Sequence, residues 1–437
     1  MTDKNFSPRR MAFEILKNID HTGSYSNLEL AARLRGSNYD TRDSGFIAAL
    51  VYGVLERQIT LDDILSRYLS RPIGKARPDV RTLLRLGAYQ IVFMDKVPGS
   101  AAVNESVKLA KGCGCAFAAG MINAVLRRVT RDDGAWRTAG WTVRYSCPQA
   151  LIDLWTDAYG RETAQAILEA SFGGNDTYLR VNTLRTTADQ LRELLRGEQV
   201  EAERVDGMPA ALRVAHSGAL ENLEAYRQGL FHVQGIPSQL CAALLDARPG
   251  MQVADVCAAP GGKTFTVTQL MENRGRVAAF DLHPHRTELI ARGARRLGLE
   301  IVTAAVRDAS ADPDAGMVFD RVLCDVPCSG LGDIASKPEL RYKDSYASPE
   351  LTAMQRRILE QSAGLVASGG KLVYSTCTLN PEENEAVCAD FLAHHPEFVL
   401  LPAQCDRARC TDGGMMTFLP QDFGGNGFFA AVLEKVR

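Results

Sequence analysis

The stretch Gln252-Val253-Ala254-Asp255-Val256-Cys257-Ala258-Ala259-Pro260-Gly261-Gly262-Lys263-Thr264 decides the fold of the C-terminal half of this 437-residue chain. Its first five residues predict a short buried strand, and a helix is expected from Lys263. The small residues and glycines between them let the backbone approach a ligand closely. Because the N-terminal amides of a helix attract a carboxylate or phosphate, the stretch predicts a ligand-binding turn between a strand and a helix.

Strands and helices alternate along the chain after this stretch. The expected strands are Gln252–Val256, Arg276–Phe280, Ile301–Val306, Arg321–Leu323 and Lys371–Tyr374, and the expected helices start at Lys263 and span Pro284–Leu297 and Glu350–Val366. This alternation predicts an α/β, doubly wound and mostly parallel sheet of the Rossmann type. Met416–Leu419 and Gly427–Val432 are expected to add antiparallel edge strands.

Residues that can bind ligands or do chemistry lie at the carboxyl end of each of the five expected strands. In chain order they are Asp255 and Cys257, then Asp281, then Asp308, then Asp325 and Cys328, and finally Cys377. Because the carboxyl ends of parallel strands lie at one edge of a sheet, we expect these side chains to lie together. Asp281 follows Gly261 by twenty residues, the offset at which an acid meets ribose hydroxyls in nucleoside-binding folds.

One rival interpretation of the glycine-rich turn is a phosphate-binding P-loop. Gly262-Lys263-Thr264 matches the end of such a loop, and Leu323-Cys324-Asp325 could be the acidic strand that holds magnesium. The P-loop needs a first glycine where this chain has Cys257, however, and Pro260 lies within the expected cradle. The sequence therefore disfavours an ATPase.

Two cysteine motifs point to a different reaction. Cys328 lies in Asp325-Val326-Pro327-Cys328-Ser329-Gly330, and Cys377 lies in Ser375-Thr376-Cys377-Thr378. The two motifs resemble the signature of RNA cytosine-5 methyltransferases. The reaction that this resemblance implies explains the need for sulfur, because carbon 5 of cytosine is a feeble nucleophile until a thiolate adds at carbon 6, and a thiolate both attacks and leaves well.

The first third of the chain is predicted to be helical, and it is basic. Apolar spacings of three and four predict helices at Pro8–Ile19, Ser26–Leu34, Asp43–Gln58, Leu61–Leu69, Pro78–Phe93, Ser100–Ala110 and Ala116–Val129. Residues 1–150 hold 22 Lys and Arg against 14 Asp and Glu, although the whole chain has a net charge of −2. This excess of positive charge indicates a surface that binds a polyanion. An ordinary solvated helical surface would explain the charge equally well.

The middle of the chain changes to short mixed elements. The expected elements are helices at Ala150–Tyr159 and Thr187–Arg196 and strands at Tyr178–Asn182, Ala211–Val214 and Leu230–Val233. Leu179-Arg180-Val181-Asn182-Thr183 resembles the first strand of the small α/β, ferredoxin-like module that precedes the catalytic domain in RNA cytosine-5 methyltransferases.

A family resemblance covers essentially the whole chain. The segments 42–46, 84–90, 97–105 and 123–128 resemble the NusB-like RNA-binding domain, which is all-α. With the two cysteine motifs, the chain resembles the bacterial 16S ribosomal RNA cytosine-5 methyltransferase B family (Fmu/Sun). The resemblance implies three domains: a NusB-like domain at 1–140, a small α/β RNA-binding module at 145–235 and a methyltransferase domain at 236–437.

The resemblance also implies a reaction and the residues that carry it. S-adenosylmethionine would donate a methyl group to carbon 5 of a cytosine in 16S ribosomal RNA through a covalent adduct, with Cys377 as attacker and Cys328 as the thiol that assists release. Asp325 would hydrogen-bond the cytosine ring, Lys263 would assist, Asp281 would hold the ribose, and Asp308 would lie near the adenine amine. The implied cofactor-binding residues are Cys257, Ala258, Ala259, Pro260, Gly261, Gly262, Lys263, Asp281, Asp308 and Asp325.

Two alternatives stay open at this point. The thiol roles could be reversed, as in DNA cytosine methyltransferases, which place the nucleophile in the Pro-Cys turn. The chain could also be an RNA chaperone or a transcription factor with an inert methyltransferase fold. The chain departs from the family where Ala335-Ser336 replace paired basic residues, and Arg341, Tyr342 and Lys343 are expected to supply the missing charge for the RNA backbone.

Composition limits the remaining possibilities. No stretch approaches the roughly eighteen apolar residues of a membrane span, and the N-terminus lacks the apolar core of a signal peptide, so a cytoplasmic enzyme without membrane contact is expected. Eleven cysteines without paired spacing favour reduced thiols, and we assign no metal. We expect a monomer that acts on a cytosine in a loop or another splayed, single-stranded segment.

Overall fold

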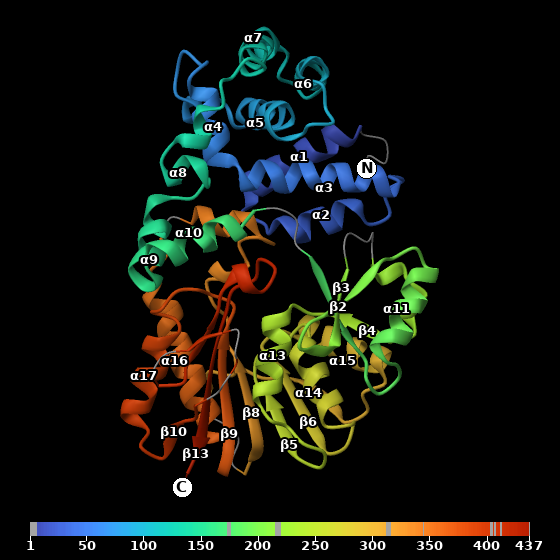
Figure 1. The fold of residues 1–437 in the computed structure, drawn as a ribbon, viewed down its shortest axis with the longest axis vertical. Coiled ribbons are helices and arrows are strands. Elements are labelled where there is room, and N and C mark those ends of the chain that lie inside the picture. Colours follow the sequence, from blue (N-terminus) through green and yellow to red (C-terminus); the bar gives the residue numbers. More distant parts are fainter. Residues whose placement is uncertain are drawn as a thin grey trace. The chain divides into compact units, whose positions relative to one another are not determined.

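The computed structural model describes residues 7–172, 176–214, 220–311, 316–343, 345–402, 405, 408–410 and 413–436. Internal contacts divide the chain into two compact units (Figure 1). The first unit comprises Met1–Phe172 with Ile334–Asp344, and the second comprises Gly173–Asp333 with Ser345–Arg437. Each unit is therefore built from two separate stretches of the chain, and the three domain boundaries expected from the sequence stay a prediction.

The first unit is helical, as predicted. Its helices are α1 Pro8–Thr22, α2 Ser26–Leu34, α3 Thr41–Glu56, α4 Gln58–Ser66, α5 Pro78–Phe93, α6 Gly99–Gly112, α7 Ala119–Val129, α8 Trp141–Arg144, α9 Gln149–Tyr159 and α10 Arg161–Ala170, with short turns at Ile73–Lys75, Ala116–Ala118, Ala135–Thr138 and Pro338–Tyr342. Local sequence explains the ends of α1: the Ser7 hydroxyl accepts a hydrogen bond from Arg10 N, Pro8 opens the helix, and Gly23 ends it at φ +67°.

The short stretch 334–344 contributes a buried cation to the first unit. The side chain of Arg341 is fully buried, and its guanidinium donates to the carbonyls of Glu56, Tyr145, Ser171 and Ile334 at 3.3–3.4 Å. A guanidinium with five N–H donors can hold several carbonyls at once. The expectation that Arg341 supplies charge to an RNA backbone is therefore wrong, because the side chain is fully buried and its Nη1 and Nη2 groups donate to carbonyls inside the unit.

The second unit begins with a four-stranded antiparallel sheet in the order β2-β3-β1-β4. The strands are β1 Thr177–Val181, β2 Ala202–Val205, β3 Met208–Val214 and β4 Phe231–Val233, accompanied by α11 Ala188–Gly197, α12 Glu224–Arg227 and a turn at Leu220–Asn222. Strand β2 was not predicted, because Glu203 and Arg204 at its centre are exposed and give no apolar pattern. The small α/β module is confirmed.

A nine-stranded mixed sheet forms the rest of the second unit. Strands β5 Gln252–Asp255, β6 Arg276–Asp281, β7 Val302–Val306, β8 Phe319–Asp325 and β9 Val366–Thr376 pair in parallel, and β10 Phe398–Leu400, β11 Arg409–Cys410, β12 Met416–Phe418 and β13 Phe428–Lys435 add antiparallel pairs. The order β11-β12-β13-β9-β8-β5-β6-β7 confirms the doubly wound sheet with antiparallel edge strands. From β5 the chain adds β6 and β7 on one side and then β8 and β9 on the other, so the strand order reverses between β5 and β8.

Helices cover both faces of this sheet (Figure 1). Helices α16 Pro349–Gly364 and α17 Glu385–His394 pack on one face, where Val322 and Tyr374 join their apolar residues. Helices α13 Ile236–Leu244 and α14 Gly262–Leu270 pack on the other face with Val253 and Leu323, and α15 Pro284–Leu297 packs beside them through Ile290 and Leu297. Short turns at Leu331–Asp333 and Pro420–Asp422 complete the unit.

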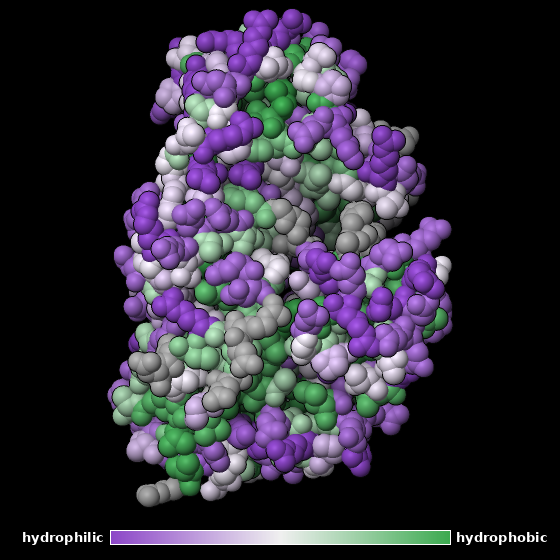
Figure 2. Space-filling model, viewed as in Figure 1, coloured by the Kyte–Doolittle hydropathy of each residue, from purple (hydrophilic) through white to green (hydrophobic). Residues whose placement is uncertain are grey.

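On the visible surface, hydrophilic side chains are interspersed with hydrophobic ones (Figure 2). Among the described residues, no helix is long and apolar enough to cross a membrane.

Candidate active site

The parallel strands of the second unit bring acids and thiols to one sheet edge, as the sequence predicts. Asp255, Asp281 and Asp325 are the last residues of β5, β6 and β8, and Cys377 directly follows β9. Pairing fixes their level in the sheet, because Asp255 lies opposite Leu323 and Asp325 lies opposite Ser375. The reversal between β5 and β8 falls in the middle of this edge, where open α/β sheets bind ligands.

The glycine-rich loop connects β5 to α14 and is tied to β6. Ala258 N donates to the Phe280 carbonyl at 2.8 Å, and Ala259 N donates to Asp281 Oδ2 at 3.3 Å. Gly261 has φ +111°, and a Cβ atom there would lie 2.3 Å from the Phe265 ring, so only glycine fits. Burial raises the pKa of Cys257 well above its ordinary value, so this thiol stays uncharged within the loop.

Three carboxylates follow the strands on the β5–β6–β7 side, and each is held differently. Asp281 is 3 % exposed and accepts from the backbone of Ala259 and His283, and its Oδ2 lies 3.3 Å from Arg286 Nη1. Asp308 follows β7 by two residues, and hydrogen bonds from the Ser310 hydroxyl and N–H lower its pKa.

Asp255 is a buried acid with one oxygen left over. Its Oδ2 accepts from the Thr264 hydroxyl at 2.6 Å, whereas Oδ1 accepts no hydrogen bond of normal geometry from the residues that the structure describes. Burial raises the pKa of Asp255 to about 7, although Thr264 partly offsets this effect. A buried carboxylate oxygen without a donor indicates a place for a cationic or N–H-bearing ligand group.

Lys263 and Asp325 join the loop after β5 to the end of β8. Lys263 Nζ lies 2.6 Å from Asp325 Oδ2, Ser375 donates to Asp325 Oδ1 at 2.8 Å, and the ammonium stands 4.7 Å from the centre of the Phe428 ring. Burial lowers the pKa of Lys263, but the charge and hydrogen bond of Asp325, with contributions from Cys241 and Cys377, outweigh burial and raise it. The site therefore keeps a positive charge beside the thiols.

The two predicted thiols are in contact. Cys328 Sγ and Cys377 Sγ lie 3.2 Å apart, farther than the roughly 2.0 Å of a disulfide, and both cysteines are free. The hydrogen bond to Cys328, followed by burial, raises the pKa of Cys377 well above its ordinary value. The Ser329 and Thr378 hydroxyls, 2.7 Å apart, and the bond from Gly332 N to the Cys377 carbonyl hold the two segments together.

Sequence reasoning missed the polar residues that surround the thiols. Ser375, Gln355, Glu383 and Asn384 are buried and hydrogen-bonded to the thiol segments or to Asp325. The polar run Asn380-Pro381-Glu382-Glu383-Asn384, directly after the Thr-Cys-Thr motif, is a signal that could have revealed two of them.

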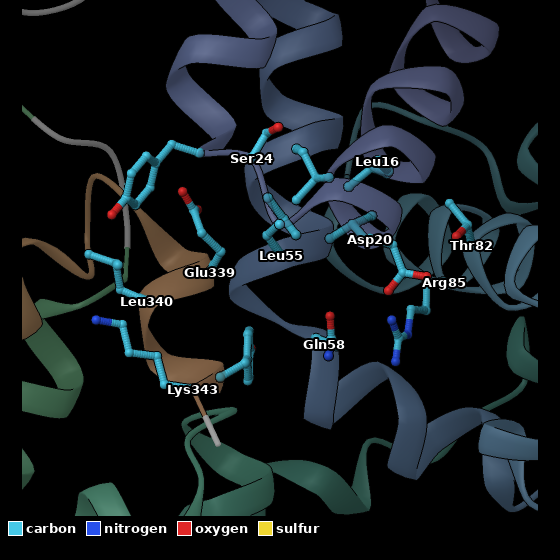
Figure 3. A pocket seen from close by; sticks show the side chains of 15 residues that line it. Leu16, Asp20, Ser24, Leu55, Gln58, Thr82, Arg85, Glu339, Leu340 and Lys343 are labelled. Atoms are coloured by element: carbon cyan, nitrogen blue, oxygen red, sulfur yellow. The ribbon is translucent and has the colours of Figure 1, made fainter. Parts of the chain in front are cut away.

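A cavity of about 410 Å³ lies elsewhere, in the first unit (Figure 3). Its walls come from the first helices and from the stretch 334–344, and its labelled side chains include Asp20, Ser24, Thr82, Arg85 and Glu339. None of the residues predicted to be catalytic or to bind the cofactor lines this cavity. Among the described residues, no group of three or more His, Cys, Asp or Glu side chains is placed to hold a metal ion.

Comparisons with known proteins agree with this geometry. Residues 242–434 match the 16S rRNA methyltransferase RsmB/F family, residues 7–131 match the NusB family, and residues 147–221 match the RsmF/B-like ferredoxin-like domain. Two relatives described as probable ribosomal RNA small subunit methyltransferase B, from Synechocystis and Bacillus subtilis, are each 36 % identical; the matches cover 98 % and 99 % of this chain and 99 % of each relative.

Solved structures give the same picture. The crystal structure of PH0851 matches with a TM-score of 0.83 and 26 % identity over 99 % of both chains. The structure of NSun6 from Pyrococcus horikoshii with SFG shares the fold, with a TM-score of 0.61 and 24 % identity over 66 % of this chain and 98 % of that one. With its helical unit, its small α/β module and its two-thiol sheet edge, the chain belongs to the ribosomal RNA small subunit methyltransferase B family.

Proposed function

We propose that this enzyme transfers a methyl group from S-adenosylmethionine to carbon 5 of a cytosine in 16S ribosomal RNA through a covalent adduct with Cys377. The observation that carries the proposal is the contact of the two thiols, 3.2 Å apart, close to the Lys263–Asp325 ion pair. Two thiols at one site match a reaction that needs one sulfur to add and leave and a second group to take a proton.

The residues on the β5–β6–β7 side fit S-adenosylmethionine. This cofactor carries an ammonium, a sulfonium and a ribose diol, and that side offers Asp255 with a spare buried oxygen, Asp281 and Asp308. Asp281 would hold the ribose, Asp308 would lie near the adenine, and residues 257–263 would line the methionine portion. When bound, the cofactor supplies an electrophilic methyl group. The relative NSun6 was solved with SFG, an analogue of S-adenosylmethionine, which supports the same choice.

Cys377 begins the reaction. Its thiol loses a proton and its sulfur forms a bond to carbon 6 of cytosine. The displaced electron pair of the double bond between carbons 5 and 6 makes carbon 5 nucleophilic, and ring nitrogen 3 takes up the proton that the thiol gave. Asp325 would hydrogen-bond the ring edge that carries this nitrogen. The Lys263 ammonium, which interacts electrostatically with Cys377, would stabilise the thiolate by charge.

Cys328 ends it. After carbon 5 has taken the methyl group, the Cys328 thiolate removes the proton from that carbon, the double bond between carbons 5 and 6 forms again, and the Cys377 sulfur leaves with the bonding electrons. The proton on ring nitrogen 3 returns to Cys377, and Cys328 passes its proton to solvent before the next turnover. The reverse assignment, with Cys328 as attacker, uses the same two sulfurs. Cys377 is favoured as attacker by the family resemblance.

The first unit would supply affinity for ribosomal RNA. Residues 1–150 carry an excess of eight positive charges, and residues 7–131 match the NusB family. Because phosphate contacts release counterions, RNA binding should weaken steeply with salt. Replacement of the exposed Lys75, Lys111 and Arg127 by Gln should flatten that dependence without changing affinity for S-adenosylmethionine.

A methyl-transfer assay tests the proposed reaction. The full chain, S-adenosylmethionine with a radiolabelled methyl group and an unmethylated 16S ribosomal RNA transcript should give 5-methylcytosine at one position, mapped by bisulfite sequencing. A deletion strain should lack that mark and regain it with the intact gene. Binding of the transcript without methyl transfer, and a deletion strain with unchanged 5-methylcytosine, would favour the RNA chaperone or transcription factor.

A further inference from the structure

The turn Asn380–Asn384, between β9 and α17, is buried although it is polar. Asn380 and Glu383 are each 2 % exposed and Asn384 is fully buried, whereas Glu382 between them is exposed. Buried polar side chains are costly unless they are hydrogen-bonded, so their partners indicate what they do. The partners of Glu383 and Asn384 belong to different thiol segments.

Glu383 binds the segment of Cys328. Its Oε2 accepts from Ser329 N at 2.8 Å and from Gln355 Nε2 at 3.0 Å, and its Oε1 accepts from Asn380 Nδ2 at 3.1 Å. The same Gln355 amide donates to the Pro327 carbonyl at 2.9 Å. The residues on both sides of Cys328 are therefore fixed to one buried carboxylate, directly or through Gln355.

Asn384 binds the segment of Cys377. The Thr376 hydroxyl donates to Asn384 Oδ1 at 2.6 Å, and Asn384 Nδ2 donates to the Thr378 carbonyl at 3.0 Å. These two bonds hold the residues immediately before and after Cys377. Asn384 therefore fixes the second thiol as Glu383 fixes the first.

We propose that Glu383 and Asn384 are positioning residues that hold the two thiols separately: Glu383 orients Cys328 for release of the product, and Asn384 orients Cys377 for attack. This inference rests on the proposed function, because it assigns each side chain to one of the two steps. Since the steps occur in sequence, loss of either side chain should slow a different one.

Isosteric substitutions can separate the two effects. In Glu383→Gln one carboxylate oxygen becomes an NH₂ group, so the N–H donors of Ser329, Gln355 and Asn380 face a single acceptor oxygen and another donor. The Cys328 turn should loosen, release should slow by about ten- to a hundredfold, and the RNA–protein adduct should accumulate. In Asn384→Asp the acceptor for Thr376 remains, but a carboxylate faces the Thr378 carbonyl. Attack should slow by a similar factor and little adduct should form.

Single-turnover experiments on the full chain test this. Each variant is mixed with radiolabelled S-adenosylmethionine and a 16S ribosomal RNA transcript, and both the adduct that survives denaturing electrophoresis and the released methylated RNA are followed in time. Glu382→Gln, an exposed neighbour, is the matched control and should behave as wild type. Calorimetry should give wild-type affinity for S-adenosylmethionine in Glu383→Gln, Asn384→Asp and Glu382→Gln. Such a result would show that the cofactor-binding side of the sheet edge is folded in each variant.

A further variant guards against misfolding. If Glu383→Gln fails to bind S-adenosylmethionine, Gln355→Met removes the bonds to Glu383 and Pro327 from the other side and should also accumulate adduct. Two results would overturn the inference. The first is that Glu383→Gln, or Gln355→Met if it is used instead, slows attack and release equally. The second is that Glu383→Gln releases product at the wild-type rate although Cys328→Ala traps the adduct. Absence of adduct from Cys328→Ala itself would instead contradict the proposed function.

Discussion

The two halves of the sheet edge are built on different principles. On the β5–β6–β7 side, side chains close in sequence hold the acids: Ser310 holds Asp308, and Thr264 holds Asp255. On the β8–β9 side the partners are distant, since Cys328 contacts Cys377 across 49 residues and Ser329 binds Glu383 across 54. The comparison teaches that short-range side-chain bonds hold Asp255 and Asp308, whereas the contact of the two thiols requires β8 and β9 to have become neighbours.

The largest expected effect lies in the chemical half. Cys377→Ala should give neither adduct nor methylated RNA, because no sulfur can add to carbon 6. Cys328→Ala should form the adduct and stall, so that an RNA–protein species survives denaturing electrophoresis. Both should lower turnover by roughly a thousandfold or more. Cys410→Ala, which changes an exposed thiol of the same unit, is the control and should keep full activity.

The opposite pattern would reverse the roles. A stable adduct from Cys377→Ala, with none from Cys328→Ala, would make the Pro-Cys thiol the nucleophile and leave the reaction class in place.

A smaller effect is expected where the halves meet. Asp325→Asn removes the partner of a buried ammonium, so we expect a loss of about 3 kcal/mol in stability and of at least about a hundredfold in methyl transfer. Lys263→Met combined with Asp325→Asn should recover stability without activity, because no unpaired charge remains. Denaturant unfolding and single-turnover assays of the two single variants and the double variant measure this. If the double variant is no more stable than Asp325→Asn, the ion pair does not join the halves.

In the binding half, Asp281→Ala should weaken S-adenosylmethionine binding by about ten- to a hundredfold, because it removes the carboxylate that we propose makes charge-assisted hydrogen bonds to the ribose. Calorimetry checks the affinity, and alkylation of Cys377 should stay unchanged if the halves act independently. Glu288→Ala, an exposed carboxyl on α15, is the control. Unchanged affinity in Asp281→Ala would remove this residue from the cofactor site.

The smallest effect concerns the acidity of one thiol. Hydrogen bonding to Cys328 is the main cause that raises the Cys377 pKa, so Cys328→Ala should lower it. More thiolate is then present at a given pH, and the pH profile of Cys377 alkylation by iodoacetamide should move to lower pH, with a severalfold faster rate at pH 8. Mass spectrometry of the Cys377 peptide measures the rate. A profile that does not move would show that the two sulfurs titrate independently.

This contrast explains how much could be predicted from sequence. Helices such as Pro78–Phe93 and strand ends such as Asp281 and Asp325 follow from periodicity and turn residues, which act over a few positions. The motif cysteines could be found because each sits in a short recognisable segment. Asn384 was missed although Thr376 and Thr378 lie only eight and six residues away. Glu383 could not be assigned its partners Ser329 and Gln355, since those bonds depend on which elements become neighbours. Arg341 was misplaced for the same reason: its burial depends on carbonyls of Glu56, Tyr145 and Ser171, far away in the sequence.

The stretch 334–344 also changes what counts as a module in this protein. The chain leaves the second unit after Asp333, completes the first unit around Arg341, and returns at Ser345, so the units are joined by two covalent crossings in addition to the one at residues 172–173. One proteolytic cut near residue 172 cannot separate them, and a gene fragment that ends there encodes an unfinished helical core. A chimera that takes its N-terminal region from a homologue would therefore also need the homologue's segment equivalent to 334–344, so two separate segments would have to be exchanged.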